Sequence, residues 1–292
     1  MPRVKTLVTH VIPHLDDIAA LWLLVRFDPS AKKAPLKFGE TSPEGVKLAK
    51  GEVGVGVGRG RYDEHKGDLK DSAVSLVWKD LKRRGLTPVS HRGAALAALV
   101  DFVRRGDMGE YIGKEGPGIA TATTLRALAK LPGESSKSAT LVGFRLLDAE
   151  LVLYEERAKI DAALARGKKF TTKWGRGVGI SVEAVPGMVS GRIAELGYAM
   201  VVLHYSKTGF LHVRATPGTK VDLSKLAKQV MKEEPQARWY LHHSKKMLLQ
   251  GDWVAPVTTR SKYGVKEMIT LIARLYPPLK VRGGRRGYAR LR

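Results

Sequence analysis

Two short clusters of histidines and carboxylates each follow an apolar segment of the chain. Neutral imidazole nitrogens and carboxylate oxygens are the ligands that borderline and hard divalent cations prefer. Two such clusters in one domain predict a two-metal hydrolytic site, in which the ions hold the attacking and leaving oxygens of a phosphoryl group. The members of the clusters are, in chain order, His10, His14, Asp16, Asp17, Asp63, Glu64 and His65.

Each cluster also has a structural interpretation, which the sequence leaves open. Asp16 and Asp17 precede an apolar segment at 18–27, and carboxylates at the start of a helix cap its free N–H groups. His10 and His14 are also compatible with ordinary, partly buried side chains, and Asp63, Glu64 and His65 with a charged turn. The joint occurrence of two histidines and two aspartates within a few residues favours the metal site.

The first half of the sequence alternates between strand and helix patterns, so an α/β domain with a largely parallel sheet flanked by helices is expected at 1–148. In this arrangement His10 lies at the carboxyl end of the first strand, where open α/β sheets bind their ligands. Strands are predicted at 5–11, 36–39, 52–61 and 140–144. Helices are predicted at 18–27, 72–82, 93–105 and 120–129.

The second half is richer in strand patterns and is predicted to form a smaller, basic α+β domain at 168–280. A helix at 149–167 is the expected connector between the domains, and 281–292 is an expected flexible tail of arginine and glycine. The expected strands of this domain lie at 178–184, 198–205, 211–215 and 237–242. Its expected helices lie at 223–233 and 265–275.

The net charge of +23 is unevenly distributed along the chain. Residues 1–167 contain 27 Lys and Arg against 21 Asp and Glu, whereas residues 168–292 contain 24 against 7. A nearly balanced half joined to a strongly basic half suggests that the first performs chemistry while the second holds a polyanion. The expected partner is RNA or DNA, with single strands favoured by the Arg, Gly and Tyr residues of the tail. Charge that only maintains solubility is the alternative.

One segment of the basic half, 237–246, combines an arginine, two aromatic residues, two histidines and two lysines. This composition suits base stacking and phosphate contacts, whereas the structural alternative is an amphipathic strand followed by a charged turn. His242 and His243 are not expected to bind a metal together, because adjacent strand residues point to opposite faces. The predicted substrate-binding residues are Arg238, His243, Ser244, Lys245 and Lys246.

Several other classes of protein are disfavoured. The glycines at 54–58 do not open a helix, which excludes a dinucleotide-binding fingerprint, and the chain has no Gly-Lys-Ser/Thr triplet for a phosphate-binding loop. Without cysteine there are no disulfides and no thiolate metal sites. No apolar run approaches the roughly 18–20 residues that cross a bilayer. The first residues carry no signal-peptide pattern, and a cytoplasmic protein that does not bind membranes is expected.

Several motifs, taken together, resemble those of the DHH phosphoesterase superfamily. A Thr-His-x-x-Pro-x-x-Asp-Asp motif at 9–17 follows the first strand, and Asp-x-His at 63–65 follows a later one. A helix of small residues comes next at 72–77. Within the superfamily the chain is similar to the Myg-type exonuclease branch, whose Asp-Asn-Gly segment has its counterpart around Asp107. The resemblance covers roughly residues 5–110.

This resemblance implies a metal-dependent phosphoesterase, specifically an exonuclease-like nuclease of RNA or DNA that uses Mn²⁺ or Mg²⁺. In that case His65 would face the scissile phosphate, and water would attack phosphorus. The residues implied to bind two ions are His10, His14, Asp16, Glu64 and Asp107. The implied catalytic residues are Asp17, Asp63 and His65.

Three positions depart from the superfamily motifs. His14 replaces the usual aspartate of the first motif, Glu64 replaces the first histidine of the Asp-His-His turn, and Gly56 stands where a metal-bridging aspartate is usual. Histidine and glutamate remain competent ligands, whereas glycine offers none, so one metal position can be weakened or lost. The alternative hypothesis is a catalytically inactive nucleic-acid-binding protein with the same fold. A small-molecule phosphatase is a weaker third hypothesis, because the basic half carries more charge than a small substrate requires.

Overall fold

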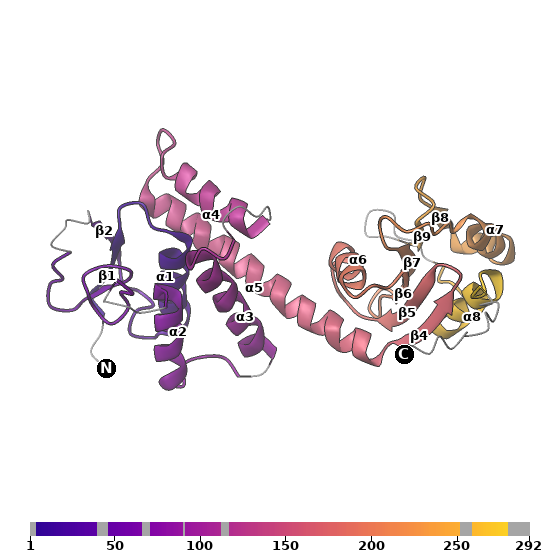
Figure 1. Ribbon diagram of the computed structural model, residues 1–292, viewed down its shortest axis with the longest axis horizontal. Helices are drawn as coiled ribbons and strands as arrows, with labels where there is room; N and C mark the ends of the chain where they lie inside the picture. The colour runs from indigo at the N-terminus through magenta and orange to yellow at the C-terminus, as the bar shows by residue number, and fades with distance from the viewer. Residues whose placement is uncertain are drawn as a thin grey trace, which may run out of the picture. The chain divides into compact units, whose positions relative to one another are not determined.

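The computed structural model describes residues 4–39, 46–65, 71–89, 91–111, 117–251 and 259–279. The chain divides into two compact units, Met1–Glu155 and Glu156–Arg292, and each is described by itself. The boundary between them falls inside the long helix α5 (Ser136–Arg166), which contributes to both (Figure 1). The tail predicted at 281–292 lies outside the described residues.

The first unit is built on a parallel three-stranded sheet in the order β2-β1-β3. The central strand β1 is buried, since Leu7, Val8 and Thr9 have no solvent exposure. Its strands are β1 (Thr6–His10), β2 (Leu36–Gly39) and β3 (Glu52–Gly54). Its helices are α1 (Leu15–Phe27), α2 (Ala73–Arg83), α3 (His91–Asp107), α4 (Pro117–Leu128) and the first part of α5.

Helix α1 forms the centre of this unit. Every residue from Asp16 to Leu24 is buried, and the helix contacts α2, α3 and β1. The indole N–H of Trp22 donates a hydrogen bond of 2.8 Å to Asp148 of α5, and Arg26 pairs with the same carboxylate. These contacts hold α5 against α1.

The strand predicted at 52–61 ends early. After β3, Val55 makes a single bridge to Tyr62, and the chain between them turns back on itself. Positive φ angles produce this reversal, which is why glycine is needed there. The residues with positive φ are Gly56 (64°), Gly58 (76°) and Arg59 (49°). The loop therefore returns the chain to the edge of the sheet just before residues 63–65.

The strand predicted at 140–144 is wrong, because these residues lie inside α5. Ser135 and Ser138 open the helix by exchanging hydrogen bonds between hydroxyl and backbone N–H groups, at 2.8 and 3.2 Å. No proline follows before Gly167, and the helix continues through Gly143. The connecting helix consequently begins at Ser136, well before the predicted start at 149.

The second unit contains a mixed six-stranded sheet in the order β4-β5-β6-β7-β9-β8. Strands β5 and β6 pair in parallel and all other neighbours are antiparallel. Its strands are β4 (Lys168–Thr172), β5 (Gly175–Ser181), β6 (Met200–His204), β7 (Leu211–Ala215), β8 (Trp239–Leu241) and β9 (Met247–Gln250). Its helices are the end of α5, α6 (Pro186–Glu195), α7 (Ser224–Glu233), a 3₁₀ turn (Pro235–Ala237) and α8 (Val265–Leu275).

The predicted fold class is confirmed: a parallel sheet flanked by helices is followed by a second unit with a mixed sheet. Strands β4 and β9 and helix α6 were not predicted; β4 in particular is polar and largely exposed, so it lacks an apolar strand pattern. Within the described ranges, no helix combines the length and the apolar character that crossing a bilayer requires.

Candidate metal centre

The carboxyl end of β1 and the turn after it bring three imidazole rings together in the first unit. His10 is the last residue of β1, and His14 is the N-cap of α1. The ring centroid of His10 lies 6.3 Å from that of His14 and 6.2 Å from that of His65. Burial lowers the pKa of His10, and the neighbouring His14 lowers it further, so His10 favours the neutral form that can bind a metal.

Asp16 is buried and caps a helix other than its own. Its carboxylate accepts hydrogen bonds from the backbone N–H groups of Ala73 (2.8 Å) and Val74 (3.0 Å) at the start of α2. Burial and the negative charge of Asp107 raise the pKa of Asp16 well above its ordinary value. Asp16 therefore caps α2, whereas the structural interpretation of the sequence had it cap α1.

Asp17 caps α1 and also faces the loop after β3. One carboxylate oxygen accepts the backbone N–H of His14 at 2.9 Å. The other, Oδ1, lies 2.0 Å from the position that a Cβ atom on Gly56 would occupy, and Nε2 of His10 lies 3.5 Å from the same point. Burial raises the pKa of Asp17 to about 7.

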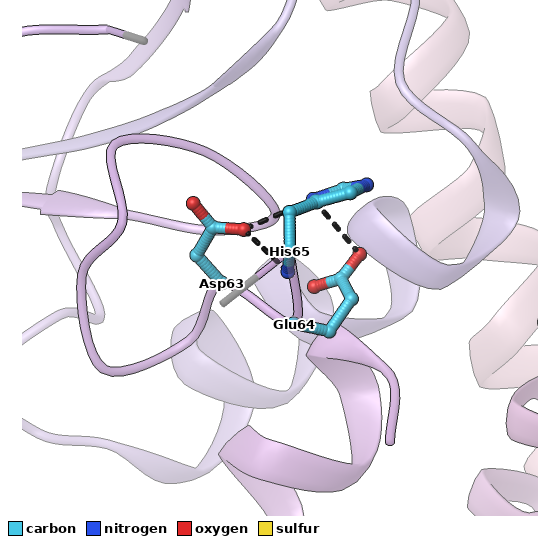
Figure 2. Close-up of side chains that lie close together, drawn as sticks. All are labelled: Asp63, Glu64 and His65. Carbon is cyan, nitrogen blue, oxygen red and sulfur yellow. Dashed lines mark hydrogen bonds and ion pairs between the residues drawn. The ribbon is translucent and has the colours of Figure 1, made fainter. Parts of the chain in front are cut away.

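Asp63, Glu64 and His65 follow the loop at 56–61. The carboxylates of Asp63 and Glu64 flank the side chain of His65 (Figure 2). Asp63 accepts hydrogen bonds from the backbone N–H and the Nδ1 atom of His65, both at 3.0 Å, and from the N–H of Arg59 at 2.6 Å. Burial raises the pKa of Asp63, but the hydrogen bonds from His65 and Arg59 outweigh it and lower the pKa. Figure 2 shows the carboxylate of Glu64 on the other side of His65, with Oε1 at 3.7 Å from Nδ1.

A buried hydrogen bond anchors this loop to α2. The hydroxyl of Tyr62 donates to Asp80 of α2 at 2.7 Å, and Asp80 also pairs with Arg83 and Arg84. Tyr62 immediately precedes the Asp63-Glu64-His65 segment, so α2 positions that segment relative to α1.

Three carboxylates from three different segments meet at this place. Asp16 of α1, Glu64 of the loop and Asp107 at the end of α3 each place one oxygen within 4.8 Å of the others. Burial raises the pKa of Glu64, and partial desolvation raises that of Asp107, although Asp107 keeps access to solvent. Glu64 Oε2 is buried without a hydrogen-bond partner among the described residues. Such an arrangement favours a cation that would balance the charge.

The structure thus gathers all eight residues that the sequence assigned to catalysis and metal binding. Their individual roles remain predictions. Asp63, Glu64 and His65 form a second group of three ligand atoms within 4.8 Å, and Glu64 belongs to both groups. The oxygen and imidazole ligands are those that Mn²⁺ and Mg²⁺ accept, with imidazole better suited to Mn²⁺.

The predicted substrate-binding residues lie in the second unit. Arg238 directly precedes β8, whereas the other four lie in the turn between β8 and β9. Arg238, His243, Ser244 and Lys245 are exposed, and Arg238 and Lys245 have positive φ angles of 49° and 59°. Lys246 differs, because its ammonium group donates to the backbone carbonyls of Thr219 and Val221. These contacts connect Lys246 to the segment between β7 and α7.

The prediction that His242 and His243 point to opposite faces of a strand is wrong. Both residues follow β8 and lie in the turn, so their rings are adjacent, with centroids 3.9 Å apart, and do not point to opposite faces. Neither belongs to a group of three potential metal ligands among the described residues.

A pocket next to the carboxylates was not predicted. Its lining includes Phe102 and Tyr111 on one side and Arg126 of α4 on another, together with Asp16 and Asp107. Phe102, Val103, Gly106 and Asp107 repeat at helical spacing along α3, which is a signal that the sequence contains. Ala122, Thr123 and Arg126 of α4 have the same spacing, but nothing in the sequence indicates that α3 and α4 face each other.

Comparisons with known proteins find only weak likenesses. No protein-family model and no curated protein sequence matches the chain. Among solved structures, RecJ from Thermus thermophilus, in complexes with Mg²⁺ and with Mn²⁺, is similar with a TM-score of 0.31 and 18% identity, covering 94% of this chain. These matches cover 50% and 53% of RecJ, so the chain spans about half of its length. An uncharacterized protein from Helicobacter pylori has a TM-score of 0.27 and 8% identity, over 92% of this chain and 99% of that protein.

Proposed function

We propose that this protein is a divalent-metal-dependent phosphodiesterase, an exonuclease-like nuclease of RNA or DNA. The observation that carries the proposal is the convergence of Asp16, Glu64 and Asp107, with one oxygen of each within 4.8 Å of the others. Like charges this close repel one another unless a cation or protons compensate them. The DHH-type motifs of the sequence support the same assignment.

The residues present fit Mn²⁺ or Mg²⁺. The described ligand atoms are carboxylate oxygens and imidazole nitrogens, and the unpaired, buried Oε2 atom of Glu64 is available for a cation. Glu64 belongs to both groups of ligand atoms, so it would hold a cation together with Asp16 and Asp107 or beside Asp63. When bound, such ions polarise a phosphoryl oxygen and ease the deprotonation of water.

His65 is the residue best placed to act on a phosphate. Asp63 holds its ring by a hydrogen bond of 3.0 Å, while 64% of its side chain is exposed to solvent. Burial lowers the pKa of His65, but the hydrogen bond to Asp63 and the charge of Glu64 raise it overall. A protonated His65 carries a positive charge and can donate a hydrogen bond to a phosphoryl oxygen, where charge accumulates during hydrolysis.

The basic second unit supports a polyanionic substrate. Residues 168–292 carry 24 Lys and Arg against 7 Asp and Glu. Such an excess favours the phosphate backbone of a nucleic acid, which binds through the release of counterions. Arg238, His243 and Lys245 are exposed members of this unit and are proposed to contact the substrate.

The alternative is a protein that binds nucleic acid without cleaving it. Two observations favour it: both oxygens of Asp16 already accept backbone hydrogen bonds from α2, and Gly56 provides no carboxylate. In this case the cluster serves to position α1, α2 and the loop, and only the basic unit has a function in binding.

Hydrolysis of end-labelled single-stranded RNA and DNA separates the two hypotheses. The protein would be assayed with EDTA, Mn²⁺ or Mg²⁺, beside the variants His65→Ala, Asp107→Asn and Asp101→Asn. Asp101 and Asp107 both lie on α3, but Asp101 pairs with Arg104 on the surface, so it is a matched control.

The nuclease hypothesis predicts metal-dependent cleavage that His65→Ala and Asp107→Asn reduce by about two orders of magnitude or more, while Asp101→Asn cleaves normally. All variants should bind an uncleavable oligonucleotide as the parent protein does. Tight binding with no cleavage under any metal condition would instead establish the binding-only hypothesis.

A further inference from the structure

The pocket next to the carboxylate cluster is lined by chemically different side chains. It has a volume of about 280 Å³ and lies within the first unit, between α3, α4 and the first turn of α1. Its lining includes two carboxylates, Asp16 and Asp107, and two aromatic side chains, Phe102 and Tyr111. A ligand in this pocket would therefore touch the proposed metal site and an aromatic surface at the same time.

The two aromatic side chains of the pocket hold one another in place. The rings of Phe102 and Tyr111 are stacked, with centroids 5.2 Å apart and an angle of 29° between their planes. Gly106 lies beneath the ring of Tyr111, and a Cβ atom there would already reach it at 3.5 Å. The absence of a side chain at this position lets the ring lie close to α3. The guanidinium group of Arg105 lies 5.4 Å from the centroid of the Tyr111 ring, so Tyr111 is held by both Phe102 and Arg105. The parts of the two rings that line the pocket offer aromatic contacts for a nucleobase.

The pocket also contains a positively charged side chain. Arg126 lines it from α4, is exposed, and forms no ion pair with any residue that the structure describes. An arginine without a carboxylate partner is available to bind an anion such as a phosphate. The pocket therefore offers contacts for a flat ring and for a phosphate, beside ligands for a divalent cation.

We infer that this pocket binds one nucleotide, the terminal residue of the nucleic-acid substrate, with its base against Phe102 and Tyr111. The inference rests on the proposed function. Beyond that function, it states which part of the substrate binds in the first unit. Its volume of about 280 Å³ lies just below the range of roughly 300–1,000 Å³ that is typical of small-molecule pockets, so the pocket has room for no more than one nucleotide. A site that accommodates only one nucleotide beside the reacting phosphate selects the end of a nucleic-acid strand.

Calorimetric titration of the full chain with adenosine, AMP and inorganic phosphate tests this inference. Adenosine would be titrated with EDTA present, so that its binding does not depend on a metal. Ala122 lines the pocket from α4, and Ala122→Trp should fill it. Ala127→Trp introduces the same side chain at an exposed position of the same helix that does not line the pocket, and is the matched control.

The expected result is that adenosine and AMP bind, that Ala122→Trp weakens both by about tenfold or more, and that Ala127→Trp does not. As a second variant, Arg126→Ala should weaken AMP but leave adenosine unchanged. The inference is overturned if adenosine does not bind, if Ala122→Trp binds it normally, or if inorganic phosphate binds as tightly as AMP.

Parallel assays on labelled oligonucleotides keep the two proposals distinguishable. Cleavage of oligonucleotides without adenosine binding would refute the nucleotide pocket and leave the nuclease assignment in place. Adenosine binding that Ala122→Trp abolishes, in a protein that cleaves nothing, would support the pocket and refute the nuclease assignment.

Discussion

Asp17 occupies the space that a side chain on Gly56 would need. A Cβ atom at position 56 would lie 2.0 Å from Oδ1 of Asp17 and 3.5 Å from Nε2 of His10. The superfamily that the sequence resembles usually has an aspartate at this point. Here a carboxylate oxygen is present beside it, but it comes from α1. With a glycine at position 56, a carboxylate is therefore still present at this place.

Gly56→Ala should destabilise the protein more than an equivalent substitution elsewhere. Gly85 has nearly the same φ angle, 65° against 64°, but no atom lies within 4 Å of its Cβ position. Gly85→Ala should cost about 1–2 kcal/mol for the left-handed backbone alone. Gly56→Ala should cost about 1–3 kcal/mol more, because it also collides with Asp17.

Urea unfolding of both variants measures this difference in the free energy of unfolding. The additional cost at position 56 should shrink when Asp17→Ala is combined with Gly56→Ala. Equal costs at the two glycines would show that Asp17 does not fill the space beside Gly56.

Binding of Mn²⁺ should stabilise the folded protein. At a concentration of one hundred times the Kd, a ligand of the native state alone adds about 2.7 kcal/mol. Glu64→Gln should weaken Mn²⁺ binding by at least about tenfold, because Glu64 belongs to both groups of ligand atoms. Thermal unfolding with EDTA and with increasing Mn²⁺ checks this. An unchanged Tm at millimolar Mn²⁺ would contradict a metal site.

Acid should weaken the anchor of the loop that carries Asp63, Glu64 and His65. Burial raises the pKa of Asp80, but hydrogen bonds from Tyr62, Arg83 and Arg84 lower it to about 2. Because the folded pKa lies below the ordinary value of 3.8, the ionised carboxylate stabilises the native state above about pH 4. This contribution is lost as the pH falls towards 2.

Asp80→Asn should therefore cost about 1–3 kcal/mol at pH 7, as expected for hydrogen bonds to a charged group, and less at pH 3. Unfolding of both proteins in urea at pH 3, 5 and 7 gives the comparison. A cost that does not change with pH would assign the destabilisation to lost packing and not to the charge of Asp80.

Arg238 and Lys245 should affect nucleic-acid binding without supporting the fold. Both are exposed and have positive φ angles, so replacement by glycine removes a charge and relieves backbone strain. The variant with Arg238→Gly and Lys245→Gly should be at least as stable as the parent. Its affinity for single-stranded RNA or DNA should fall, and the slope of log K against log[salt] should decrease by about 0.7 for each phosphate that is no longer neutralised.

Lys246→Ala is the contrasting variant, because its ammonium group satisfies two backbone carbonyls. It should lower the Tm. Fluorescence anisotropy at several KCl concentrations, together with thermal unfolding, separates the two effects. If the double glycine variant binds with the same affinity and salt dependence as the parent, the turn between β8 and β9 does not contact the substrate.

The sequence by itself determined which residues could form a reactive centre and where strands and helices lie around it. The β-branched run before His10 forms β1, and the apolar segment after Asp17 forms α1, because both patterns depend on local hydrophobicity and spacing. The prediction failed at 140–144, where an apolar, β-branched run belongs to a long helix. Leu141 and Val142 are 47% and 39% exposed, so the run does not mark a buried strand.

Tertiary structure alone decided the partners of each site residue. Nothing near Asp16 in the sequence indicates that its carboxylate accepts the N–H groups of Ala73 and Val74, more than fifty residues away. Likewise, the proximity of Asp17 to Gly56 and the joining of Phe102, Tyr111 and Arg126 in one pocket depend on how α1, the loop, α3 and α4 pack. Residue type and local spacing specify the chemistry that a side chain can perform. The burial, charge and contacts that decide whether it does so come from segments that meet only in the folded chain.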